Sequence, residues 1–561
     1  MDSTINRKIA STLLFSLPSS TLLAFGLSYS FRHTCAPTSK LTVGAFICLS
    51  VVLSLFFFLT VDRNSTREVR RQNAHGLLSK SSPCYRHPFL LSFLVLLTAW
   101  LPYYLASFPG LYVYDAITQT QWALRINLVT SWHPLAHTYW LSGLMELGYR
   151  LFGSYDIGFA LYTTSQYVLF AALLSCFISK LHLIWHNATA TIATVAFFGL
   201  FPMFPIMAVS STKDTIFSAS FALCAIELLY ICRTAVPKRD YCLFFVSGIL
   251  VSCFRNNGFY ALAIALVILI IAKHNNRRIV FTSVLLIMSG LALALLIPKL
   301  VSDDMSSSTE MLGVPIQQVC RAAINHYDEL NEVETNALER TIPSWQNYMP
   351  ATVDPVKFSG GTAKAIESNK STFFRLWLAL MQRYPEDYLD ALYGLINGWL
   401  SPAFTYSSFD TTKPYFEFDS WEIEEKGMLV RRWQNSSEHL AYDTANVIEV
   451  HRISLFPGFE PIMRSLCYSP FWTGNLAFTI LTSVALPIYL LYYMICVSIF
   501  HKEVDSLVVL LFASAYVATC LLGPVFLPRY ALPVYSIYPL LIALCMCEPH
   551  TSESKTPQIE G

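Results

Sequence analysis

Long apolar stretches alternate with short polar ones along most of this chain. A helix that crosses a bilayer needs about 20 largely apolar residues, and twelve stretches approach that requirement, two of them short. They cover residues 9–31, 41–61, 89–108, 157–179, 188–208, 215–232, 241–254, 257–272, 279–298, 471–499, 506–526 and 531–547. The pattern predicts an all-α polytopic membrane protein with about 12 transmembrane helices.

Composition strengthens this prediction. Hydrophobic residues make up 54% of the 561 positions and charged residues only 13%, whereas a soluble domain carries about 25% charged residues. The net charge of +1 gives no reason to expect a nucleic-acid partner. The expected partner is the lipid bilayer.

Polar residues interrupt the apolar run 241–272 near its middle. Arg255, Asn256 and Asn257 stand there in succession, and a cation flanked by two amides is costly in hydrocarbon. We therefore expect two spans that meet at Arg255.

The distribution of lysine and arginine predicts the orientation. With the N-terminus inside, inner loops hold 17 basic residues and short outer loops hold eight, as the positive-inside rule requires. We expect a multi-pass protein of the cell membrane with both termini cytoplasmic. The expected parts are a transmembrane hairpin (1–61), a basic cytoplasmic loop (62–88), a transmembrane core (89–300) with a first outer loop (109–156), an extracytoplasmic domain (301–470), C-terminal transmembrane helices (471–548) and a cytoplasmic tail (549–561).

The region 301–470 differs from the rest of the chain. It holds 23 acidic and 13 basic residues, and it is long enough to form its own core. We expect a mainly helical, water-exposed domain, in which Pro385 begins a helix. A disulfide between Cys320 and Cys467 remains open.

Two aspartates stand out on the expected outer side. Asp115 lies in the first outer loop, shortly after the span that ends at residue 108, and Asp214 lies between two later spans. A charged residue at a membrane boundary is a functional candidate. Alternatively, Asp214 could N-cap the following helix, and Asp115 could be a solvated loop residue. We expect 134–153 to form a helix on the outer surface.

Three cations and a histidine accompany these aspartates. Lys213 precedes Asp214, Arg255 and Arg529 lie at outer ends of spans, and His133 begins a His-Pro pair in the first outer loop. Arginine binds phosphate through two parallel hydrogen bonds. Each arginine could instead extend to lipid headgroups.

The order of these parts resembles the GT-C class of membrane glycosyltransferases, which includes protein O-mannosyltransferases and aminoarabinose transferases. The matching features are Asp115, then His133-Pro134, then Asp214, and a soluble domain towards the C-terminus. Short motifs also resemble a bacterial family of uncharacterised multi-spanning proteins related to that class. They are Ser211-Thr212-Lys213-Asp214, Phe254-Arg255-Asn256-Asn257-Gly258, Val314-Pro315-Ile316-Gln317-Gln318 and Pro528-Arg529-Tyr530.

This resemblance implies transfer of a sugar from a polyprenyl-phosphate donor to an extracytoplasmic acceptor, with inversion. A carboxylate would take the proton of the acceptor hydroxyl, and we expect Asp115 in that role. Cations would stabilise the departing lipid phosphate, and we expect Arg255, Arg529 and Lys213 there.

The remaining expected site residues have supporting roles. Asp214 would position a substrate or help to hold a divalent cation, and His133 would orient Asp115. Asn256 and Tyr530 complete the expected substrate-binding set. No metal site is predicted, and a divalent cation is left open as the only cofactor.

Two other functions remain as alternatives. A non-enzymatic transporter or flippase of lipid-linked glycan would place charged groups near the bilayer midplane, where Glu227 is the one clear carboxylate. A structural envelope protein would bind a polymer through its outer domain.

Overall fold

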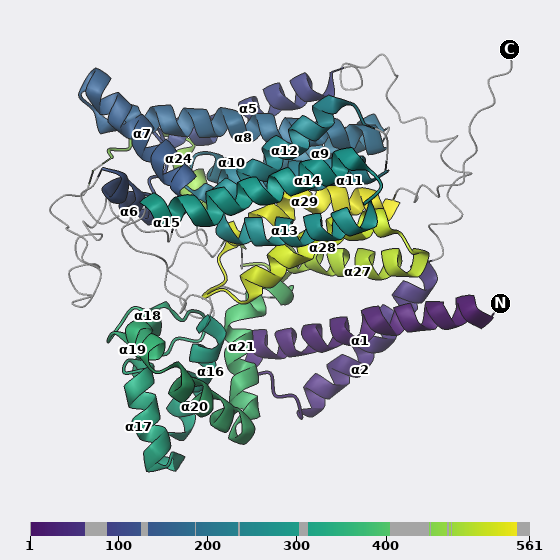
Figure 1. The fold of residues 1–561 in the computed structure, drawn as a ribbon, viewed down its shortest axis with the longest axis vertical. Coiled ribbons are helices and arrows are strands. Elements are labelled where there is room, and N and C mark those ends of the chain that lie inside the picture. Colours follow the sequence, from purple (N-terminus) through teal and green to yellow (C-terminus); the bar gives the residue numbers. More distant parts are fainter. Residues whose placement is uncertain are drawn as a thin grey trace.

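The computed structural model describes residues 2–61, 87–124, 133–185, 187–233, 236–301, 312–403, 448, 450–467, 471–472 and 474–546. Nearly all of these residues are helical, and the described parts contain isolated β-bridges but no strand. The prediction of an all-α chain is therefore confirmed at this level. Most helices of the bundle run roughly parallel to one another, and the domain that contains α16 to α20 lies at one end of it (Figure 1).

The first half of the bundle consists of helices whose bounds follow most of the apolar stretches. They are α1 (Asp2–Arg32), α2 (Lys40–Thr60), α5 (Pro88–Ala106), α6 (Tyr114–Ala123), α7 (Leu135–Phe152), α8 (Tyr155–Trp185), α9 (Ala188–Leu200), α10 (Met203–Ala208), α11 (Lys213–Arg233), α12 (Lys238–Phe254), α13 (Asn256–Ala272), α14 (Arg277–Leu291) and α15 (Ile297–Val301), the last two joined by a π-helical turn.

The later helices form the separate domain and the end of the bundle. The domain contains α16 (Gly313–His326), α17 (Glu332–Thr341), α18 (Asp354–Lys357), α19 (Thr362–Ser368), α20 (Lys370–Arg383) and α21 (Pro385–Leu400). After it come α24 (Glu460–Cys467), α26 (Leu476–Thr482), α27 (Ala485–His501), α28 (Val504–Leu521) and α29 (Pro528–Met546). Helix α21 begins at Pro385, as predicted.

Eight helices in the described parts are long and apolar enough to cross a membrane, and nine if the bent pair α26 and α27 counts as one span. The apolar helices α9 and α13 are shorter. The predicted stretch 188–208 breaks near Pro202, where α9 gives way to the short helix α10. The predicted split of 241–272 is confirmed, because α12 ends at Phe254 and α13 begins at Asn256.

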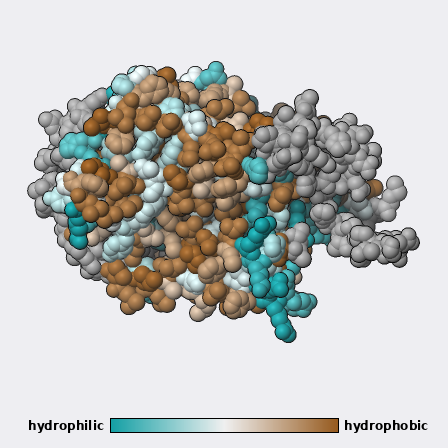
Figure 2. Space-filling view, turned by 90° about the horizontal axis from the view of Figure 1, so that it is seen from above, coloured by the Kyte–Doolittle hydropathy of each residue, from teal (hydrophilic) through white to brown (hydrophobic). Residues whose placement is uncertain are grey.

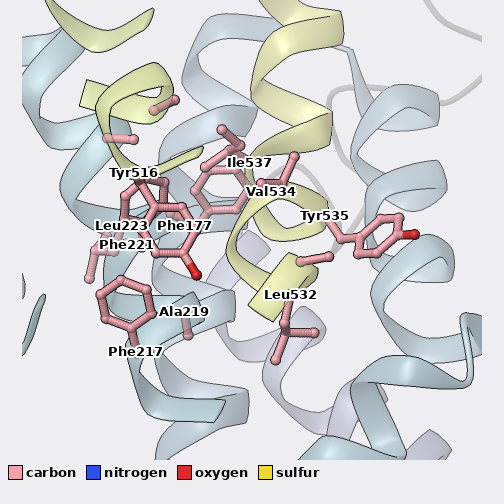
Figure 3. Packing of buried hydrophobic residues seen from close by; sticks show 14 of the residues in the cluster. Phe177, Phe217, Ala219, Phe221, Leu223, Tyr516, Leu532, Val534, Tyr535 and Ile537 are labelled. Atoms are coloured by element: carbon pink, nitrogen blue, oxygen red, sulfur yellow. The ribbon is translucent and has the colours of Figure 1, made fainter. Parts of the chain in front are cut away.

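Helix α11 occupies the centre of the bundle. It packs against α8, α12, α28 and α29. Of the residues in its most apolar 18-residue stretch, 94% are buried. Figure 3 shows side chains from α11 and α28 meeting beside α29. The face of the bundle in Figure 2 is apolar over a broad area, and helix α5 carries exposed leucines. This inside-out distribution is typical of helices surrounded by lipid.

The separate domain has a core of its own, which includes Ile316, Phe373 and Leu380. The domain also holds the segment that precedes α29. The Val353 amide donates to the Pro524 carbonyl at 3.1 Å, and the Trp399 and Phe526 rings pack edge to face. The chain therefore enters α29 from a position set by the domain.

The N-terminal hairpin also touches this domain. The Cys35 amide donates to Asp390 of α21 at 2.7 Å, and Asn397 donates to Ser30 at 2.9 Å.

Cys320 and Cys467 are both free thiols in separate cores, so the disulfide left open above is absent from the structure.

Candidate functional site

Two loops that are distant in sequence are joined at one end of the bundle. The Leu111 amide donates to the Val209 carbonyl at 2.8 Å, and the Ser211 amide donates to the Leu111 carbonyl at 3.0 Å. Gln166 of α8 supports the second loop by donating to the Ser210 carbonyl at 2.7 Å. Because α6 and α11 begin just after these contacts, their first turns lie side by side.

Asp115 lies in the first turn of α6 and is largely buried. Its Oδ2 accepts from Arg529 Nη1 at 2.9 Å and lies 3.6 Å from Lys213 Nζ. Burial alone would raise the pKa of Asp115, but the charges of Arg529 and Lys213 outweigh it and hold the pKa well below its usual range. Asp115 is therefore ionised, and it is not the solvated loop residue of the alternative.

Asp214 lies in the first turn of α11 and is fully buried. Its Oδ1 lies 2.8 Å from Arg255 Nη1, and its Oδ2 lies 3.8 Å from Arg529 Nε and accepts from the Thr212 hydroxyl at 3.1 Å. Arg529 thus contacts both aspartates. Asp214 is inside the helix and paired with arginine, so it is not an N-cap.

Lys213 connects His133 to Asp115. Its Nζ lies 2.7 Å from His133 Nδ1, and burial together with the Lys213 charge lowers the pKa of His133 to about 3. A neutral imidazole accepts at Nδ1 from the lysine ammonium. His133 would therefore act on Asp115 indirectly, by positioning the Lys213 ammonium that lies beside both residues.

The break at Arg255 places a guanidinium inside the bundle. Arg255 has extended backbone between α12 and α13, and its guanidinium lies 4.3 Å from the centre of the Tyr530 ring. That ring is also 5.2 Å from the Arg529 guanidinium. Tyr530 thus lies against both arginines, whereas the expected site residue Asn256 is exposed at the start of α13.

The five charged side chains form one cluster: Asp115, Lys213, Asp214, Arg255 and Arg529. None of these side chains is more than 12% exposed. Three cations face two carboxylates, so the cluster has a formal charge of +1. A buried site with a net positive charge favours the binding of an anion. We call this set the charged cluster.

A buried hydrogen-bond chain supports the cluster from α7 and α8. His137 Nδ1 lies 2.6 Å from Gln119 Oε1, His137 Nε2 lies 2.7 Å from the Tyr162 hydroxyl, and that hydroxyl donates to Gln166 at 2.6 Å. Gln166 in turn holds the loop before Asp214. Sequence reasoning missed Tyr162 and Gln166, which lie inside an apolar stretch. Their polarity within that stretch is the one sequence signal that could have identified them.

Helices α7 and α8 approach closely enough to fix this chain of contacts. A Cβ added at Gly158 of α8 would lie 2.8 Å from the Leu144 carbonyl oxygen of α7, so this crossing requires glycine. Helix α7 matches the helix expected over 134–153, and it is not among the helices long and apolar enough to span a membrane.

The described residues contain no group of three or more His, Cys, Asp or Glu side chains placed to hold a metal ion. The histidines that the structure describes near these helices contact other side chains. His133 contacts Lys213, His137 contacts Gln119 and Tyr162, and His182 contacts Thr191 at 2.7 Å.

A second buried set of charges lies between α8, α11 and α12. Lys180 Nζ is 3.0 Å from Glu227 and 2.9 Å from Asp240. Glu227, the carboxylate expected near the bilayer midplane, is thus paired with a lysine. This arrangement is that of a structural ion-pair triad.

We expect the midpoint temperature of thermal unfolding to decrease as the pH is lowered from about 7 to about 5. The decrease should be smaller in His133→Asn. An unfolded histidine binds a proton near pH 6.5, whereas His133 in the folded protein does so at about 3. The unfolded chain therefore binds more protons in this window, so acid favours unfolding. Asparagine retains an acceptor for Lys213 without titrating. Equal declines in both proteins would contradict the buried, neutral state of His133.

The comparisons with known proteins give one family and no named relative. A family model described as "Family of unknown function (DUF6020)" matches residues 122–558, which include every member of the charged cluster except Asp115. Comparisons with curated proteins and with solved structures gave no match. Since the match covers more than three quarters of the sequence, the chain belongs to this DUF6020 family of unknown function.

Proposed function

We propose that this protein is a membrane glycosyltransferase that moves a sugar from a polyprenyl-phosphate donor to an extracytoplasmic acceptor, with inversion. The observation that carries the proposal is the charged cluster, in which three buried cations and two carboxylates meet at one end of an apolar bundle. Such a site fits a substrate with a long apolar tail and an anionic head.

The charge of the cluster favours a phosphate joined to both a sugar and a lipid. A phosphodiester carries one negative charge, which would balance the formal charge of +1. Arg255 and Arg529 lie near different oxygens of Asp214, and arginines suit phosphate oxygens. As the lipid phosphate leaves, charge grows on its oxygens, and cations already in place stabilise that charge.

Asp115 is the proposed general base. Both of its ion pairs use Oδ2, so an acceptor hydroxyl would approach Oδ1. Its lowered pKa makes it a weak base in the resting site. A donor phosphate would draw Lys213 towards itself, and the loss of that pairing would raise the basicity of Asp115.

The transporter alternative has less support. It calls for charged groups along a path near the bilayer midplane, but Glu227 is paired with Lys180 at 3.0 Å.

The proposed setting is a multi-pass position in the cell membrane, with the charged cluster and the domain from α16 to α21 on the outer side. An outer acceptor could be a glycan, a lipid or a protein.

The function is tested in two steps with purified protein in vesicles. First, polyprenyl phosphate should bind, while polyprenol without phosphate should bind weakly. Second, a panel of labelled polyprenyl-phosphate sugars, supplied with envelope extract as the acceptor source, should yield labelled product and free polyprenyl phosphate. A cysteine placed at exposed Val333 should react with an impermeant reagent only from outside. Failure of phosphate-dependent binding would end the proposal.

A further inference from the structure

The hydroxyl of Tyr516 connects the two arginines of the charged cluster. Tyr516 lies on α28, and its hydroxyl accepts from Arg255 Nη1 at 2.9 Å. The same hydroxyl donates to the Tyr530 carbonyl at 2.8 Å. Tyr530 directly follows Arg529, so one oxygen atom contacts the Arg255 side chain and the backbone next to Arg529.

Arg255 lies at the break between α12 and α13, where its backbone is extended. Its buried guanidinium is held by Asp214 at 2.8 Å and by the Tyr516 hydroxyl at 2.9 Å. Next to it, Asn257 donates to Thr519 of α28 at 3.1 Å. The break is therefore docked against α28 at two places, one of which is the guanidinium itself.

The Tyr516 ring is itself firmly placed. It is fully buried, and its centre lies 5.3 Å from that of Phe217 and 5.2 Å from that of Phe221, both on α11. Figure 3 shows these three rings together, with Tyr535 projecting from the other side of α29. A buried hydroxyl on a packed ring is a fixed reference point for the groups bonded to it.

We infer that Tyr516 is a positioning residue that holds Arg255 and Arg529 at the spacing needed to bind the donor's phosphate. This inference rests on the proposed function. The two cations have to be in place before charge develops, since moving them during the reaction would consume the stabilisation that they provide. Tyr516 acts through the arginines and makes no contact with the reacting atoms.

The test compares Tyr516→Phe with Tyr535→Phe. Both changes remove a tyrosine hydroxyl, because Tyr535 donates to the Thr482 carbonyl at 2.6 Å. Tyr516→Phe should weaken binding of polyprenyl phosphate about tenfold, the value of a hydrogen bond to a charged group. It should leave binding of polyprenol unchanged, which a general loss of structure would not do. Tyr535→Phe should change neither affinity.

A thermal double-mutant cycle separates this inference from the proposed function. Tyr516→Phe should lower the unfolding midpoint clearly in the wild-type background and much less in Arg255→Gln, because the partner is then already changed. If the midpoint changes of the two single variants simply add in the double variant, the role of Tyr516 is overturned. The same holds if Tyr516→Phe binds polyprenyl phosphate as tightly as Tyr535→Phe does. If the wild type binds no polyprenyl phosphate while the midpoints remain coupled, the proposed function fails and the hold on Arg255 stands.

Discussion

Asp115→Asn should slow sugar transfer at least ~100-fold, the lower range for removal of a general base. Asparagine has nearly the same shape, so the contact with Arg529 at 2.9 Å can persist through its amide oxygen. The variant loses the ability to take a proton from the acceptor. Its affinity for polyprenyl phosphate should not fall, since the cluster becomes more positive. Initial rates of product formation, with binding measured in parallel, provide the check.

Glu146→Gln is the matched control for Asp115→Asn. Glu146 is a carboxylate of α7 that pairs with Arg150 at 2.7 Å on an exposed face, so this change removes an equivalent charge outside the cluster. Transfer should remain at the wild-type rate. A rate for Asp115→Asn close to that of Glu146→Gln would exclude Asp115 as the base while leaving phosphate binding by the cluster in place.

Arg255→Ala should weaken binding of polyprenyl phosphate between ~10-fold and ~100-fold, because it removes a charge-assisted contact from a site shielded from water. The loss also leaves Asp214 without its partner at 2.8 Å, so the unfolding midpoint should fall. Asp214→Asn in the Arg255→Ala background should recover part of that midpoint without restoring affinity. Equilibrium binding and thermal unfolding measure the two effects separately.

Arg233→Ala serves as the control for the arginine. Arg233 ends α11 at the opposite end from Lys213 and pairs with Glu503 at 3.7 Å, and its side chain is 16% exposed against 11% for Arg255. Its removal should leave phosphate affinity unchanged. Equal losses in the two variants would point to general destabilisation and would count against a phosphate site at Arg255.

The members of the charged cluster could be found from sequence because charge is costly at the end of an apolar run. Arg255 interrupts such a run, Asp214 and Arg529 lie between two runs, and Asp115 follows one. The structure brings all four together. Their pairing could not be predicted, since Arg529 meets Asp115 across 414 positions. Tyr516 was missed because a tyrosine within an apolar helix has the same pattern as a packing residue.

The fold shows the same limits. Apolar length predicted a helical membrane protein, and the cost of Arg255 in hydrocarbon predicted the break between α12 and α13. The break near Pro202 was missed, although proline lacks the amide proton that a helix needs. Asn256 was expected in the site by adjacency, but the helical turn that begins there directs it outward.

Arg529 is held by both the helical bundle and the separate domain. Its own helix lies in the bundle, but the residues just before it are held by the amide of Val353 and the ring of Trp399. A rigid tilt of the separate domain would therefore pull on the first turn of α29 and alter the separation of Arg529 from Asp115. Under the proposed function, an acceptor large enough to rest on that domain would thus act on Arg529, the side chain that binds the donor's phosphate.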